Sequence, residues 1–89
     1  MNHLPSPHLG MTLPHLAAWR QYFFWSQRQL AKKSGVGYTH IARIERGHRV
    51  FGTTIERLAL AFGITPRDLI LTPPETYYAQ TSHHSSAEG

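Results

Sequence analysis

The chain has 89 residues, a formal net charge of +4 and no cysteine. This length predicts one small domain, and the lack of cysteine excludes disulfides and zinc sites built on thiolates. No apolar run approaches the roughly 20 residues of a membrane span, and the N-terminus lacks the basic start and apolar stretch of a signal peptide. We therefore expect a soluble cytoplasmic protein.

The basic charge is concentrated in one part of the chain. All nine lysines and arginines lie in the segment 20–68, where only Glu45, Glu56 and Asp68 oppose them. This segment therefore carries a net charge of +6, which favours a polyanionic partner such as nucleic acid. A solvated surface would have the same composition, so charge alone leaves both interpretations open.

Apolar residues are dense only between Leu13 and Leu71. The flanks, 1–12 and 72–89, have too few apolar residues to offset the entropy lost on ordering, so we predict flexible tails. The predicted domain is then 13–71.

Helix signals recur in this domain, and no strand signal stands out. Pro14 suits the first turn of a helix over about 14–24. Ser26 is a good N-cap for a second helix over about 27–33, which Gly35 ends.

Three further helices follow. One covers about 38–46 and ends at Gly47. Thr53 and Glu56, three positions apart, form a capping-box pattern for the fourth helix. A short fifth helix is capped by Thr65. Five short helices with tight links predict a compact all-α fold.

The helix at 38–46 has two different faces. At about 100° per residue, Ile41 and Ile44 point inward. The opposite face has no carboxylate and consists of Tyr38, Thr39, Ala42, Arg43 and Arg46.

The link between the helices at 27–33 and 38–46 is about four residues long. A short glycine-containing turn between two helices is the helix-turn-helix arrangement, in which the second helix enters the DNA major groove. The first helix offers the unpaired N–H groups at its N-terminus to a phosphate.

Three motifs carry a family resemblance. "WSQRQLAKKSGV" is similar to the pattern LSQ-x-x-LA-x-x-x-GV, "IARIERG" to the end of a recognition helix, and "TIERLALAFGI" to the helix that packs behind it. Residues 16–71 thus resemble the XRE family of helix-turn-helix domains, the Cro and phage-repressor type, which have a lambda-repressor-like fold.

The resemblance implies a role for each matched residue. Gln27 would contact a phosphate or a nearby base, and Arg20 and Glu45 would form a structural ion pair. The complete DNA-binding set implied is Gln27, Arg28, Gly37, Tyr38, Thr39, His40, Ala42, Arg43, Arg46, His48 and Arg49. Within this set Tyr38, Thr39 and Arg43 would face the major groove.

The chain departs from the family pattern at several positions. Phe24 and Trp25 replace a usual glycine and leucine, and Gly37 replaces a usual Ser or Thr cap. The usual proline after Gly47 is missing. At these positions the local backbone conformation can differ from that of the family, whereas the expected fold is unchanged.

Metal binding and catalysis are poorly supported. Seven histidines are present, but no two of them stand at the helical i, i+4 spacing with a carboxylate partner. The predicted domain has no paired carboxylates, phosphate-binding glycine loop or Ser-His-Asp set. We expect no metal, no cofactor and no enzymatic activity.

The predicted function is that of a sequence-specific regulator of transcription that binds double-stranded DNA and acts as a repressor. A homodimer is expected through Ile64, Leu69, Ile70 and Leu71, although the chain's own tail could equally cover that surface. The alternative is a protein-interaction module, such as an antitoxin or a partner of an antirepressor, with autoregulatory DNA binding.

Overall fold

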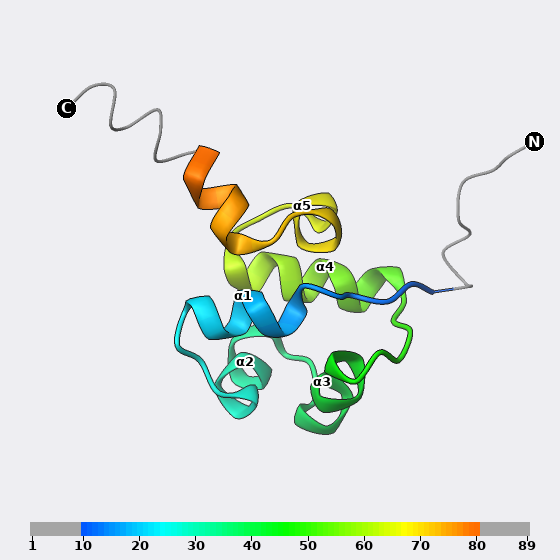
Figure 1. Ribbon diagram of the computed structural model, residues 1–89. Coiled ribbons are helices and arrows are strands. Elements are labelled where there is room, and N and C mark those ends of the chain that lie inside the picture. Colours follow the sequence, from blue (N-terminus) through cyan, green and yellow to red (C-terminus); the bar gives the residue numbers. More distant parts are fainter. Residues whose placement is uncertain (1–9, 81–89) are drawn as a thin grey trace, which may run out of the picture.

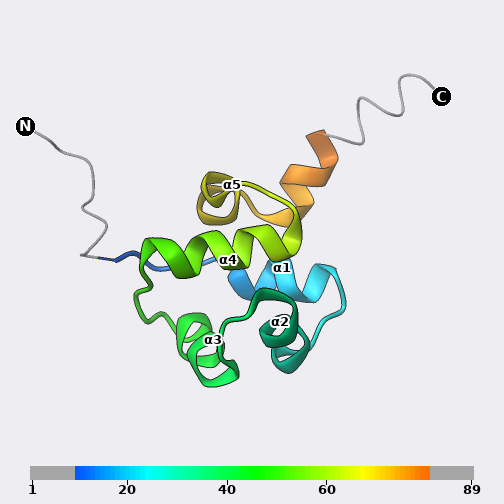
Figure 2. The same cartoon turned by 180° about the vertical axis from the view of Figure 1, so that it is seen from behind.

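The computed structural model describes residues 10–80, and its regular secondary structure in that range is helical apart from one isolated bridge. The labelled helices are α1 (Leu16–Tyr22), α2 (Gln27–Ser34), α3 (Tyr38–Glu45), α4 (Gly52–Phe62) and α5 (Pro66–Leu71). In Figure 1, α4 crosses the middle of the domain, with α5 on one side and the pair α2 and α3 on the other. The reverse view in Figure 2 has the same arrangement. The prediction of an all-α helix-turn-helix fold is confirmed.

One apolar core joins the helices. Its largest fully buried side chain is Trp19 of α1, and every described helix from α1 to α5 contributes at least one buried residue. The buried residues of α4 are Ile55, Leu58, Ala59 and Phe62, which lie on one face of the helix. These contacts hold α3 in place, because its two buried residues, Ile41 and Ile44, belong to the same core.

Local capping explains where several helices begin and end. Ser26 Oγ accepts a hydrogen bond from the backbone of Gln29, and the Gln29 side chain accepts one from the Ser26 backbone. This reciprocal capping box fixes the start of α2. Gly35 ends α2 with φ 77°, a left-handed conformation that glycine adopts without steric cost.

The predicted capping box at the start of α4 is wrong. The helix begins at Gly52, after an N-cap at Phe51 that has no side-chain hydrogen bond. Just before it, Met11 and Val50 exchange two backbone hydrogen bonds of 2.9 Å, and Val50 is fully buried. This contact between distant parts of the chain positions the backbone at residue 50, so α4 starts before Thr53.

The predicted C-terminal tail, 72–89, also needs correction, because residues 74–80 form a helix. This segment packs through Tyr77 and Tyr78, whose rings lie 5.4 and 5.8 Å from that of Trp19. The Trp19 indole N–H donates a 2.9 Å hydrogen bond to the Thr72 carbonyl. Two tyrosines that pack on the Trp19 ring therefore provide the apolar contact that composition alone did not reveal.

The predicted N-terminal tail, 1–12, is also too long, because Met11 pairs with Val50 and packs on the core. The rest of both predicted tails, 1–9 and 81–89, lies outside the described residues. No helix within 10–80 has the length and apolarity to cross a bilayer.

One residue of the predicted dimer contact is unsuitable. Leu69 is fully buried in the core and cannot reach a partner. Ile64 and Ile70 are half-buried against the core, and Leu71 is 60% exposed. A dimer contact at this position would use the exposed parts of these three side chains.

Candidate nucleic-acid interface

The turn between α2 and α3 is anchored by one apolar residue. Val36 is buried between two exposed glycines, Gly35 and Gly37. Gly37 is the N-cap of α3, has an extended backbone and makes no side-chain capping bond. The start of α3 therefore projects with free backbone N–H groups, which can face an anionic partner.

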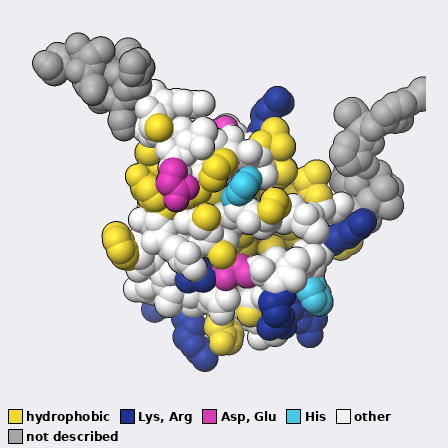
Figure 3. All heavy atoms as spheres, viewed as in Figure 1, with side chains coloured by type: hydrophobic (Ala, Val, Ile, Leu, Met, Phe, Trp, Pro, Cys, Tyr) yellow, Lys and Arg dark blue, Asp and Glu magenta, His cyan; other side chains and the backbone are white. Residues whose placement is uncertain are grey.

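The outer face of α3 contains the predicted contact residues. Ile41 and Ile44 hold the helix in the core, while the opposite side chains point outward. Of the predicted set, Ala42 and Gln27 are half-buried, and those that the structure exposes are Arg28, Gly37, Tyr38, Thr39, His40, Arg43, Arg46, His48 and Arg49. Lysine and arginine side chains gather over α2 and α3 at the lower edge of the molecule in Figure 3.

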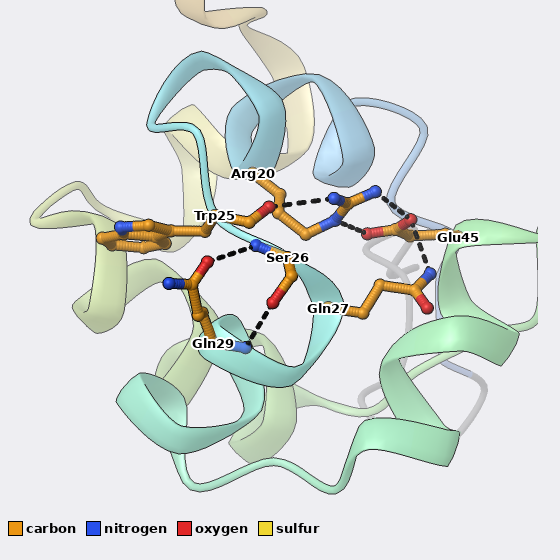
Figure 4. Close-up of polar contacts among 6 residues, drawn as sticks. All are labelled: Arg20, Trp25, Ser26, Gln27, Gln29 and Glu45. Atoms are coloured by element: carbon orange, nitrogen blue, oxygen red, sulfur yellow. Dashed lines mark hydrogen bonds and ion pairs between the residues drawn. The ribbon is translucent and has the colours of Figure 1, made fainter.

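A polar network joins the three helices behind this face (Figure 4). Arg20 of α1 donates two hydrogen bonds to Glu45 of α3, at 2.7 Å from Nε to Oε2 and 2.9 Å from Nη2 to Oε1. Its third contact is a 3.0 Å bond to the Trp25 carbonyl. The hydrogen bond to Glu45 raises the pKa of Arg20 above its usual value. Burial of the guanidinium acts in the opposite direction and is the smaller effect. The network thus ties the end of α3 to α1 and to the start of α2.

Gln27 belongs to the same network. Its Nε2 donates a 3.0 Å hydrogen bond to Glu45 Oε1, the oxygen that also accepts from Arg20 Nη2. The Gln27 amide is therefore held at the junction of α2 and α3, with a second N–H and its carbonyl oxygen available to a ligand.

Two exposed cations of α2 lie over aromatic rings that belong to residues outside that helix. The Arg28 guanidinium carbon is 4.3 Å from the centre of the Tyr38 ring. Lys33 Nζ is 4.9 Å from the centre of the Trp25 ring. Such contacts are attractive because the face of an aromatic ring carries partial negative charge. They place Arg28 beside the start of α3 and Lys33 beside Trp25.

A profile of the helix-turn-helix family matches residues 24–69, which is slightly more than half of the chain. The chain belongs to the helix-turn-helix family, of the XRE type.

The helix-turn-helix domain has relatives among known proteins. The "Neisseria hypothetical transcription factor" of Neisseria meningitidis serogroup B is 32% identical over 59 residues, which cover 65% of this chain and 56% of the relative. The chain thus matches about half the length of that protein. The crystal structure of the hypothetical transcription factor NHTF from Neisseria superposes with a TM-score of 0.59 at 27% identity, covering 89% of this chain and 94% of the other.

The two unusual aromatic residues of the helix-turn-helix domain have different environments. Phe24 has φ 59° and is 91% exposed, so it occupies a left-handed position without any compensating burial. Trp25 stacks on Phe62 with ring centres 5.4 Å apart and packs against the core. The departure at Phe24 therefore strains the turn, whereas the departure at Trp25 extends the core.

No group of three His, Asp or Glu residues within 10–80 is arranged to hold a metal ion. Four of the seven histidines, His3, His8, His83 and His84, lie outside the described residues.

Proposed function

We propose that this helix-turn-helix protein is a sequence-specific DNA-binding regulator of transcription that acts as a repressor, with α3 in the major groove. The observation that supports this most strongly is the composition of the outer face of α3. Tyr38, Thr39 and Arg43 are exposed there and do not belong to the core, on a helix that two buried isoleucines hold in place. The curated relative and the solved structure described above carry the same name, that of a hypothetical transcription factor from Neisseria.

In this proposal the residues divide into two groups. Arg43 contacts a base edge, since arginine pairs with guanine O6 and N7 through two hydrogen bonds. Arg46, His48 and Arg49, at the end of α3 and in the following loop, contact phosphates. Phosphate contacts release counterions, so binding should weaken steeply as salt rises.

We further propose a homodimer that binds a palindromic site, since dimers of such domains contact two half-sites about one helical turn apart. Leu71 and the exposed parts of Ile64 and Ile70 are the candidate contact. A cytoplasmic location follows from this function.

The protein-interaction alternative has less support. It requires a C-terminal segment that is available to a partner protein, and residues 74–80 instead pack on the aromatic core through Tyr77 and Tyr78.

Selection of binding sites from random duplex DNA tests the proposed function. We expect enrichment of one motif with two symmetric halves, and binding of that motif that weakens as salt is raised. The absence of salt-dependent binding to any duplex would disprove the DNA-binding role. A single asymmetric motif would disprove the symmetric dimer alone.

A further inference from the structure

A shallow groove separates α2 from the start of α3. It has a volume of about 530 Å³, and its lining includes Arg28, Lys32, Gly35, Gly37 and Tyr38. Lys32 was not among the residues that the sequence assigned to DNA contact. The lining contains two cations and no carboxylate.

The two cations lie on the same side of α2. Arg28 and Lys32 are four residues apart, so one is placed above the other, one helical turn away. Neither of them has a carboxylate partner within residues 10–80. Two adjacent positive charges without a partner raise the local potential and favour an anion between them.

The rim of the groove is open. Gly35 and Gly37 both lie there, and a Cβ added to either would meet no atom within 4 Å. No side chain at these positions prevents a bulky group from approaching Arg28 and Lys32.

Tyr38 forms one wall and orients Arg28. The ring occupies one face of the guanidinium, at 4.3 Å from ring centre to carbon. The guanidinium N–H groups lie in the plane of that group, so stacking leaves them free for an acceptor. An arginine held in this way loses less conformational freedom when it binds an anion.

We propose that this groove binds a phosphate of the DNA backbone through Arg28 and Lys32, with Tyr38 as a positioning residue for Arg28. This inference rests on the proposed function and changes the assignment of Tyr38, which the sequence placed among the base-reading residues. A phosphate is favoured over a base edge because the groove holds two cations and no carboxylate, and a phosphate carries a net negative charge whereas a base edge does not.

The chain provides a matched control for Lys32. Lys33 is the next residue on α2, has the same charge, and lies over Trp25 instead of lining the groove. Lys32→Met and Lys33→Met therefore remove equal charge from adjacent positions, and only the first removes it from the groove.

The test measures affinity for the selected DNA site as a function of salt. We expect Arg28→Met and Lys32→Met each to reduce the steepness of log K against log salt by about 0.9, the value for one phosphate contact on duplex DNA. Lys33→Met should keep the wild-type steepness. Equal reductions for Lys32→Met and Lys33→Met would show a diffuse charge effect and overturn the site.

Tyr38 is tested by two substitutions. Tyr38→Phe keeps the ring and should retain affinity, whereas Tyr38→Leu should lower it roughly two- to fivefold. The Leu substitution should have no further effect in the Arg28→Met background. An additive loss in the double variant would overturn the positioning role.

Site selection with each variant separates phosphate from base contact. We expect Arg28→Met and Tyr38→Leu to enrich the same motif as the wild-type protein. Loss of preference at a single base position would overturn the phosphate assignment. If the wild-type protein itself shows no salt-dependent binding, the proposed function fails, and that result is distinct from all the outcomes above.

Discussion

Arg20 and Glu45 lie 25 positions apart in the sequence and form a two-hydrogen-bond ion pair that connects α1 to the last residue of α3. Their side chains are only 14% and 9% exposed. Water therefore screens the pair weakly, and loss of either partner leaves the other charge inside the protein.

We expect Arg20→Met to lower the free energy of unfolding by about 3 kcal/mol, because an unpaired, largely buried carboxylate is costly. Urea unfolding followed by circular dichroism measures the change. Arg57→Met, at an exposed position on α4, is the control and should change stability by less than about 0.5 kcal/mol. Similar losses in the two variants would contradict the structural role of the pair.

A second prediction concerns Arg43 on the outer face of α3. Arg43→Ala should weaken binding to the selected DNA site by roughly 10- to 100-fold and relax one guanine preference. Stability should not change, because the side chain is exposed. Fluorescence anisotropy with labelled duplex gives the affinity. Arg67→Ala on α5, across α4 from α3 in Figure 1, removes the same charge and should have a much smaller effect.

The strained turn between α1 and α2 gives a third prediction. Phe24→Gly should stabilise the protein by about 1 kcal/mol, since a left-handed conformation costs a residue with a Cβ roughly that amount. The removed side chain is 91% exposed, so little burial is lost. Gly35→Ala, also at positive φ and in open space, should destabilise it by a comparable amount. Thermal unfolding compares both variants, and destabilisation by Phe24→Gly would show that the exposed ring has a structural role.

The fourth prediction is a dependence on alkaline pH. Burial, with smaller effects from Tyr77 and Tyr22, raises the pKa of Tyr78 above the usual value of 10.0. The folded protein therefore retains the phenol proton to higher pH than the unfolded chain does, and stability should fall as pH rises past about 10.

Tyr78→Phe removes that proton and should make the fall in stability less steep. Urea unfolding at pH 8 and at several values above pH 10 measures the difference. An unchanged slope in the Phe variant would assign the effect to other groups.

The fifth prediction concerns the C-terminal helix. Removal of 73–89 should lower the free energy of unfolding by about 2 kcal/mol or more, since the contacts of two tyrosines with Trp19 are lost. Removal of 81–89 alone is the control and keeps both tyrosines. Equal unfolding midpoints for the two truncated proteins would mean that this helix adds nothing to stability.

Local rules predicted much of the fold because their causes are local. Ser26 caps α2, Gly35 ends it in a left-handed turn, and Thr65 accepts from the backbone of Asp68 at the start of α5. Each of these depends on residues within three or four positions. The inward residues of α3 and α4 follow from helical periodicity in the same way.

Contacts between distant residues decided the rest. Pairing of Met11 with Val50 moved the start of α4, and packing on Trp19 stabilised a helix at 74–80 in a segment whose composition is typical of a tail. Burial also withdrew Leu69 from the predicted dimer surface. Rules based on neighbouring residues do not include such contacts between distant parts of the chain.

Spacing and side-chain chemistry were enough to predict the existence of α1 to α5, the turn before α3 and the outer face of α3, although not the start of α4 or the helix at 74–80. The grouping of the outer residues depends on how the helices pack. This packing placed Gln27 against Glu45, Arg28 over Tyr38, and Lys33 over Trp25. The physical reason is that these partners come from different segments, and their distances depend on how α2 and α3 pack on the shared core.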